Sequence, residues 1–182
     1  MAVTKISSFN ISAYPQDTVF VLDTNVLYYV HSGYYLPNSN KSVDYSNVIQ
    51  IILTHGYSIK VSALSIQELL YGVENKEYQL YCQNHGKNQG SYTKKHFRRD
   101  QTQRLAVKRK LETILSELAM SYELEDGVLH FPMLEQFIDT FGTHEMDPVD
   151  YVLAHNYDAA KTVFVSGDKD FQSLTSIQVL TA

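Results

Sequence analysis

Short runs of apolar and β-branched residues alternate along the chain with longer segments whose apolar residues recur every three or four positions. Runs of the first kind are typical of buried strands, and segments of the second kind are typical of amphipathic helices. We predict strands at residues 18–22, 57–63, 128–131, 162–166 and 177–180. Because helical segments separate these strands, we expect a three-layer α/β/α fold with a central parallel sheet of about five strands.

The helical segments have clear apolar stripes and start signals. We predict helices at residues 23–30, 43–55, 65–73, 93–122, 132–141 and 147–160. The longest stripe runs through residues 93–122, whereas residues 74–92 are polar and contain Gly86 and Gly90 as breakers. Residues 33–40 are expected to be a loop, and residues 1–17 a short leader to the first strand.

Length and composition fit one domain over residues 1–182, with a basic helical insertion at about 74–122. The single cysteine, Cys82, has no partner for an internal disulfide, which favours a reducing, cytoplasmic location. Neither a signal peptide nor a membrane-spanning apolar stretch is present in the sequence, so we expect no membrane partner.

Four acidic residues lie where an apolar strand ends or a helix begins: Asp23, Glu68, Asp150 and Asp168. In a parallel α/β sheet these positions share the carboxyl edge, where such folds place their sites. Crowded carboxylates repel one another, by about 4 kcal/mol per close pair at an effective dielectric near 20. A hard divalent cation with oxygen ligands, Mg²⁺ or Mn²⁺, would compensate this charge and points to metal-assisted hydrolysis.

Each acid also has a structural explanation. Asp23 can cap a helix, and Asp168 can belong to a turn. Glu68 completes a capping box that begins at Ser65, and Asp150 holds the corresponding position after Asp147. The metal site is favoured because all four acids lie at the same end of their elements, and because first helical turns favour ionised carboxylates.

The segments that carry these acids resemble the motifs of the PIN-domain nucleases, which include the toxin ribonucleases of type II toxin–antitoxin pairs. The resemblance follows the family's order through residues 21–25 (VLDTN), Ser62 with residues 68–72 (ELLYG), residues 150–154 (DYVLA) and residues 166–171 (SGDKDF). It spans residues 18–180, with an interruption at 74–122. It departs from the family where His155 and Asn156 replace alanines, and the nearby Asp147 leaves the identity of the third acid open.

The resemblance implies a metal-dependent endoribonuclease that hydrolyses phosphodiester bonds of single-stranded RNA. Its catalytic and metal-binding residues would be Asp23, Glu68, Asp150 and Asp168, around one or two Mg²⁺ or Mn²⁺ ions, with Asp170 as a weaker fifth acid. Asn25 and Ser166 would orient these carboxylates or the substrate phosphate. A cognate antitoxin protein and a second copy of the chain are further partners to consider.

The charge is unevenly distributed. Residues 94–110 hold eight basic residues and one acid, a net charge of +7, whereas the rest of the chain holds seven basic and nineteen acidic residues, a net charge of −12. A basic segment on an acidic body suggests contact with a polyanion, so we assign Arg98, Arg99 and Arg104 to substrate binding. A solvated helix face is an equally weighted explanation of this segment.

Two other functions compete with the nuclease. A non-catalytic RNA-binding or protein-binding domain could keep the same fold, but it has no use for four crowded carboxylates. A phosphoacceptor domain is disfavoured because paired acids are missing near the first strand. The seven histidines show no helical pair or Cys/His cluster, which disfavours zinc. Tyr28, Tyr29, Tyr34 and Tyr35 flank the first acidic motif and could stack a base, although packing is favoured.

Overall fold

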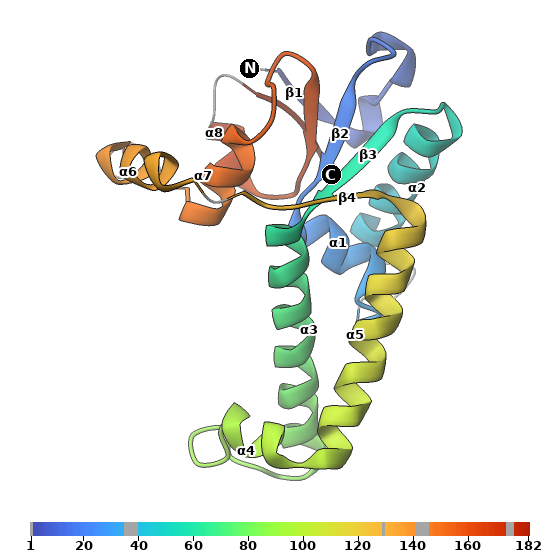
Figure 1. The fold of residues 1–182 in the computed structure, drawn as a ribbon. Coiled ribbons are helices and arrows are strands. Elements are labelled where there is room, and N and C mark those ends of the chain that lie inside the picture. The colour runs from blue at the N-terminus through green and yellow to red at the C-terminus, as the bar shows by residue number, and fades with distance from the viewer. Residues whose placement is uncertain (1, 35–39, 129, 141–145, 174–176) are drawn as a thin grey trace.

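The computed structural model describes residues 2–34, 40–128, 130–140, 146–173 and 177–182 (Figure 1). The described residues form a six-stranded sheet in the order β1-β6-β5-β2-β3-β4, in which every neighbouring pair is parallel. The strands are β1 (Ala2–Lys5), β2 (Val19–Leu22), β3 (Ser58–Ser62), β4 (Glu123–Glu125), β5 (Thr162–Val165) and β6 (Gln178–Thr181). The predicted parallel α/β architecture is therefore confirmed.

The central strands are buried on both faces. In β2, Phe20 and Leu22 belong to one hydrophobic cluster and Val21 belongs to another. In β5, Val163 and Phe164 divide between the same two clusters. Alternate side chains of a strand point to opposite faces, so a strand covered on both sides needs a continuous apolar run. This requirement explains why β2 and β5 are the clearest strands in the sequence.

Helices cover both faces and give the three layers. One cluster contains buried residues of α1 (Thr24–His31), α2 (Asn40–Thr54), α3 (Ala63–Asn84) and α5 (Gln101–Ser121). The other contains residues of α6 (Phe131–Thr140), α7 (Pro148–His155) and α8 (Lys169–Ser173). Two short 3₁₀ helices, η1 (Ile6–Ser8) and η2 (Ile11–Ala13), connect β1 to β2. Among the described helices, none is both long and apolar enough to cross a membrane.

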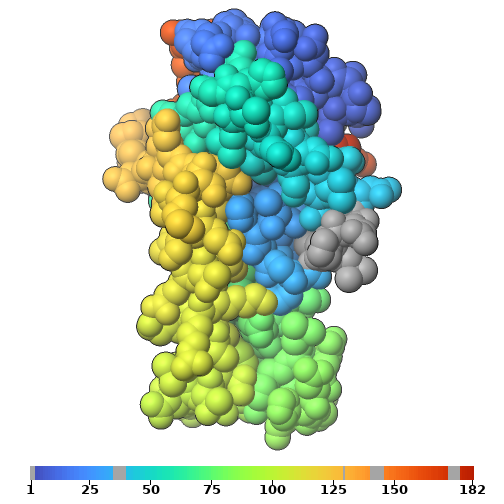
Figure 2. Space-filling model, turned by 90° about the vertical axis from the view of Figure 1, so that its right-hand side faces the viewer, coloured from blue at the N-terminus to red at the C-terminus, as the bar shows by residue number. Residues whose placement is uncertain are grey.

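Residues 74–122 form a helical arm that extends away from the sheet (Figure 1). The second half of α3 and the antiparallel α5 run side by side, and α4 (Lys94–Arg99) closes their far end. Figure 2 shows the arm as the narrow green and yellow part of an elongated molecule. Tyr78, Cys82, Phe97 and Val107 form a separate hydrophobic cluster inside it. The arm therefore has a small core of its own.

Two strand predictions were wrong for physical reasons. The strand expected at residues 128–131 lies instead at Glu123–Glu125, and Phe131 begins α6. As an edge strand, β4 is half exposed and carries an ion pair between Glu125 and Lys60, so it lacks an apolar run. The segment expected to be a leader contains β1, which extends the sheet by pairing with β6.

Several helix boundaries also differ from expectation. α3 continues from residue 73 to Asn84 because Tyr78 and Cys82 pack in the arm. The helix expected at residues 93–122 is divided at Asp100, whose carboxylate caps α5 by accepting from the Thr102 and Gln103 amides. α7 ends at His155, five residues before the expected end at 160. Residues 35–39 of the expected loop, and the expected helix end at residue 141, lie outside the described residues.

Candidate metal centre

The carboxyl edge of the sheet contains a cavity of about 320 Å³ lined by acidic side chains. Asp23 follows β2, Asp168 follows β5, Glu68 comes from the second turn of α3, and Asp150 comes from the first turn of α7. All four predicted acids line this cavity, together with Thr24, Asn25, Tyr28, Tyr29, Gly72 and Asp147. The structure therefore brings together four residues that are spread over 146 positions of sequence (23 to 168).

Asp23 is held from three sides and is only 3% exposed. Its Oδ1 accepts a hydrogen bond from the Thr24 amide at 2.6 Å. Its Oδ2 accepts from the Ser166 hydroxyl at 2.6 Å and from the side-chain amide of Asn25. Burial raises the pKa of Asp23 to about 6, while the hydrogen bonds from Ser166 and Thr24 oppose that rise. Both predicted orienting residues therefore contact this carboxylate.

Ser166 and Asn25 also join the ends of β2 and β5. The Ser166 Oγ accepts from the Asp168 amide at 2.9 Å, and the Asn25 Oδ1 accepts from the Gly167 amide at 3.0 Å. Gly167 has no room for a side chain, because a Cβ there would lie 2.7 Å from the hydroxyl oxygen of Tyr45. The loop that carries Asp168 is thus fixed against the loop that carries Asp23.

Glu68 does not complete the expected capping box. The N-cap of α3 is Ser62, whose hydroxyl accepts from the Leu64 amide at 3.2 Å, so Glu68 lies beyond the first turn. The Glu68 carboxylate instead accepts a hydrogen bond from the Thr24 hydroxyl at 2.7 Å. Ser65 is fully buried, and its hydroxyl has no hydrogen-bond partner among the described residues. The capping explanation of Glu68 is therefore wrong, and this side chain belongs to the acidic cavity.

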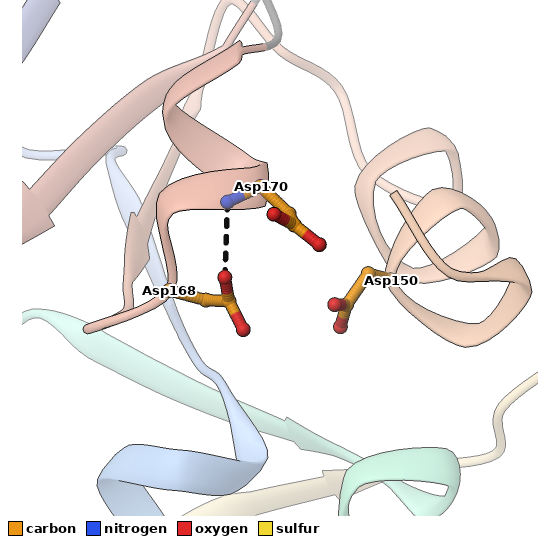
Figure 3. A group of neighbouring side chains, drawn as sticks. All are labelled: Asp150, Asp168 and Asp170. Atoms are coloured by element: carbon orange, nitrogen blue, oxygen red, sulfur yellow. Dashed lines mark hydrogen bonds between the residues drawn. The ribbon is translucent and has the colours of Figure 1, made fainter. Parts of the chain in front are cut away.

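Asp147 and Asp150 have separate tasks at the start of α7. The Asp147 carboxylate caps the helix by accepting from the Val149 amide at 2.8 Å and the Asp150 amide at 3.0 Å, and Pro148 follows it. Asp150 is 9% exposed, and its pKa is raised to about 8 by burial and by the charges of Asp23, Asp147, Asp168 and Glu68. The side chain of Asp150 points toward Asp168 and Asp170 (Figure 3).

Three carboxylates could hold one cation. Asp150, Asp168 and Asp170 each offer an oxygen, and these oxygens lie within 4.8 Å of one another (Figure 3). The Asp168 carboxylate also accepts from the Asp170 amide at 3.0 Å, which fixes its direction. Carboxylate oxygens are the ligands that Mg²⁺ and Mn²⁺ prefer. Burial and the neighbouring carboxylates raise the pKa values of Asp23 and Asp150, and a hard divalent ion at these oxygens would favour the ionised carboxylates.

Sequence reasoning assigned no role to Thr24 or Gly72, both of which line the cavity. Thr24 is the hydrogen-bond donor to Glu68. At Gly72 an added Cβ would lie 3.3 Å from the Tyr28 ring, so a small residue lets α1 and α3 pack closely here. Both residues lie inside the motif segments 21–25 and 68–72, and this position was the feature of the sequence that could have indicated a role in the site.

The three predicted substrate-binding arginines lie on the helical arm and do not line the acidic cavity. Arg98 binds the Glu74 carboxylate through its Nε at 2.6 Å and through a second guanidinium nitrogen. Arg104 donates to the Arg98 carbonyl at 2.7 Å and to the Arg99 carbonyl at 3.0 Å. Two of these arginines therefore have internal partners.

Comparison with known proteins identifies the fold. No family model matches the chain, and no curated protein matches it in sequence. Among solved structures, a chain in the crystal structure of VapBC2 from Rickettsia felis, bound to a DNA fragment from its promoter, aligns with a TM-score of 0.54. The alignment covers 90% of this chain and 98% of that chain, at 16% sequence identity. The chain thus shares the fold of that chain, which agrees with the PIN-like fold expected from its motifs.

Proposed function

We propose that this protein is a metal-dependent endoribonuclease that hydrolyses phosphodiester bonds of single-stranded RNA. The observation that carries the proposal is the convergence of Asp23, Glu68, Asp150 and Asp168 on one cavity at the carboxyl edge of a PIN-like sheet. A binding domain would gain nothing from carboxylates that repel each other and repel a phosphate backbone. A bound cation reverses both repulsions, which is why these residues favour catalysis over the non-catalytic alternative.

The proposed metal ligands divide into two groups. Asp150, Asp168 and Asp170 would hold one Mg²⁺ or Mn²⁺ ion, since their oxygens already lie within 4.8 Å of one another. Asp23 and Glu68, which line the same cavity, would complete the site. When bound, such an ion polarises a phosphodiester and lowers the pKa of a water molecule that attacks phosphorus.

The chain's own residues prepare the site in three ways. Ser166 and Asn25 fix the Asp23 carboxylate, and Thr24 fixes that of Glu68. The N-terminus of α7 favours the ionised form of Asp150 once a cation offsets the neighbouring charges. Closely packed, hydrogen-bonded carboxylates lose little freedom on binding a cation or a phosphate, which favours rapid chemistry.

The partner proposal rests on the fold. The structurally similar chain belongs to VapBC2, which was crystallised with promoter DNA. We infer that the present chain acts as the toxin of a toxin–antitoxin pair and has an antitoxin partner. The single buried cysteine, Cys82, agrees with a reducing compartment such as the cytoplasm.

Cleavage of a labelled single-stranded RNA tests the proposal. We expect endonucleolytic products with Mg²⁺ or Mn²⁺, none in EDTA, and recovery when the metal is restored. Asp23→Asn should lower the cleavage rate at least about a hundredfold, because a metal ion supplies several kcal/mol of transition-state stabilisation. Circular dichroism should show an unchanged fold.

The matched control is Asp139→Asn, which removes an exposed acid from α6 and should leave the rate unchanged. Cleavage that persists in chelator, or that survives Asp23→Asn, would exclude the metal-dependent nuclease. RNA binding without cleavage under any metal would favour the non-catalytic alternative.

A further inference from the structure

We propose that Tyr71 and Lys94 form a nucleotide-binding subsite next to the acidic cavity, in which the Tyr71 ring stacks on a base and Lys94 contacts the adjoining phosphate. The inference rests on the proposed function for its substrate class, single-stranded RNA. It assigns a binding task to one residue of α3 and one of α4, and it connects the helical arm to the acids.

A second cavity lies beside the acidic one. It has a volume of about 420 Å³ and is lined by Leu64, Gln67, Glu68, Tyr71 and Val149. Glu68 lines both cavities, and Val149 directly precedes Asp150 on α7. A polynucleotide with one phosphate at the acids could therefore place a neighbouring nucleotide in the second cavity.

Tyr71 provides an aromatic surface in this cavity. Tyr71 is 60% exposed, whereas Tyr78 on the same helix is buried in the hydrophobic cluster of the arm. The ammonium of Lys94 lies 3.9 Å from the Tyr71 ring centroid, so a cation covers one face of the ring. An exposed ring beside a cation is the combination by which proteins bind single strands, because every base has a π-face and every nucleotide has a phosphate.

Lys94 lacks an anionic partner. Its ammonium is buried and has no hydrogen-bond partner among the described residues. The nearby Glu74 carboxylate is occupied by two hydrogen bonds from Arg98, so Lys94 interacts with it only through the electrostatic field. A charged donor left without an acceptor is costly, and a substrate phosphate would supply one within reach of the flexible lysine stem.

The internal pairing of Arg98 thus has a consequence for substrate binding. Because Arg98 neutralises Glu74, the positive charge of Lys94 remains available next to Tyr71. The subsite would be tolerant of sequence, since stacking and a phosphate contact read neither the edge of the base nor its hydrogen-bonding groups.

A double-mutant cycle that combines protein variants with modified RNA substrates tests the subsite. The substrates are RNA oligonucleotides in which a single abasic nucleotide is placed at each position of the strand in turn. Their affinity for the protein, which carries Asp150→Asn to prevent cleavage, is measured by fluorescence anisotropy. With Tyr71 present, we expect roughly tenfold weaker binding when the abasic nucleotide occupies one or two adjacent positions. With Tyr71→Ala, the intact oligonucleotide should bind roughly tenfold more weakly, and the abasic nucleotide at those positions should cause no further loss.

Matched variants separate stacking from general damage. Tyr71→Phe keeps the ring and should retain the position-specific loss, whereas Lys94→Met should weaken binding and flatten its salt dependence. Lys161→Met, at an exposed lysine that precedes β5 and so lies at the opposite edge of the sheet, should change neither. Equal abasic effects with and without Tyr71 at every position would overturn the subsite, as would a Tyr71→Phe variant as weak as Tyr71→Ala.

A failure of the subsite and a failure of the proposed nuclease function give different results. Cleavage by the otherwise unmodified protein with Mn²⁺ tests the nuclease, while the anisotropy cycle tests the subsite without any cleavage. Coupling between Tyr71 and one base in a protein that never cleaves RNA would keep the subsite and exclude the nuclease.

Discussion

The carboxylate of Asp23 both caps α1 and faces the acidic cavity. Its two oxygens have different partners. Oδ1 accepts the capping hydrogen bond from the Thr24 amide, and Oδ2 accepts hydrogen bonds from the side chains of Ser166 and Asn25. Capping and site formation are therefore not alternatives for this residue. Around α7 the tasks are divided between two residues instead, because Asp147 takes the capping hydrogen bonds and Asp150 faces the other acids.

The raised pKa of Asp150 predicts a pH-dependent stability for the metal-free protein. A carboxyl with a pKa near 8 in the fold, against an ordinary value of 3.8, binds its proton more tightly when folded. Its contribution to stability is full below the ordinary value and is lost as pH rises through about 8. With EDTA present, we expect the free energy of unfolding to fall between about pH 6.5 and 8.5, by at most about 1.4 kcal/mol per pH unit.

In this pH range the change in the free energy of unfolding comes mainly from Asp150. The pKa of Asp23 is raised only to about 6, and burial lowers the pKa of His31, so both titrate mostly below it. Asp150→Asn should abolish the decline and make the metal-free protein more stable than the original at about pH 8. Urea titrations across the window measure the effect. A decline that persists in Asp150→Asn would assign it to other groups.

At the scale of the elements, the helical arm combines internal ion pairs with cations that have none. Arg98 pairs with Glu74, Lys108 with Glu112 and Lys110 with Glu77. Lys95, Arg99 and Arg109 are exposed, and among the described residues their side chains have no ion pair or hydrogen bond. The basic segment therefore has both a structural use and a set of charges available to a polyanion.

Replacement of Lys95, Arg99 and Arg109 by alanine tests RNA contact by the arm. Because no side-chain hydrogen bond or ion pair of the described residues is lost, the melting temperature should hardly change. Each phosphate contact on a single strand contributes about −0.7 to the slope of log affinity against log salt, so three lost contacts should reduce that slope by roughly 2. Binding titrations at several salt concentrations measure it.

Arg98→Ala is the informative comparison for this variant. It removes one positive charge but also leaves Glu74 without its partner, so it should lower stability as well as affinity. An unchanged salt slope in the triple variant would assign the basic segment to a solvated helix face.

For the whole molecule, the parallel sheet concentrates negative charge at one edge, and a cation that binds there should stabilise the fold. An ion at about a hundred times its dissociation constant contributes about 2.7 kcal/mol, which corresponds to a rise of roughly 5–10 °C in melting temperature for a chain of this size. We expect this rise with Mg²⁺ or Mn²⁺ in thermal unfolding followed by circular dichroism.

The same measurement on Asp168→Asn should show little of that rise, while Asp139→Asn on α6 should keep it. An equal rise in all three proteins would indicate general charge screening and would contradict a specific metal centre at Asp150, Asp168 and Asp170.

Much of the fold and several site residues could be predicted because their causes are local. A strand covered on both faces requires a continuous apolar run, which marks β2 and β5 without knowledge of their neighbours. Edge strands have no such requirement, so β4 and β1 left no comparable pattern. Helix caps at Asp23 and Asp147 were also predictable, since a cap binds amides within three residues of itself.

The sequence by itself determined the parallel α/β architecture and the presence of acids at strand ends and at the first turn of α7, because both follow from burial and capping within a few residues. Only the tertiary structure decided which polar groups meet. Thr24 reaches Glu68 across 44 positions, Ser166 reaches Asp23 across 143, and Arg98 pairs with Glu74 across 24. Those pairings depend on strand order and on the path of the helical arm, which place distant residues within hydrogen-bonding range and leave no periodic trace along the chain.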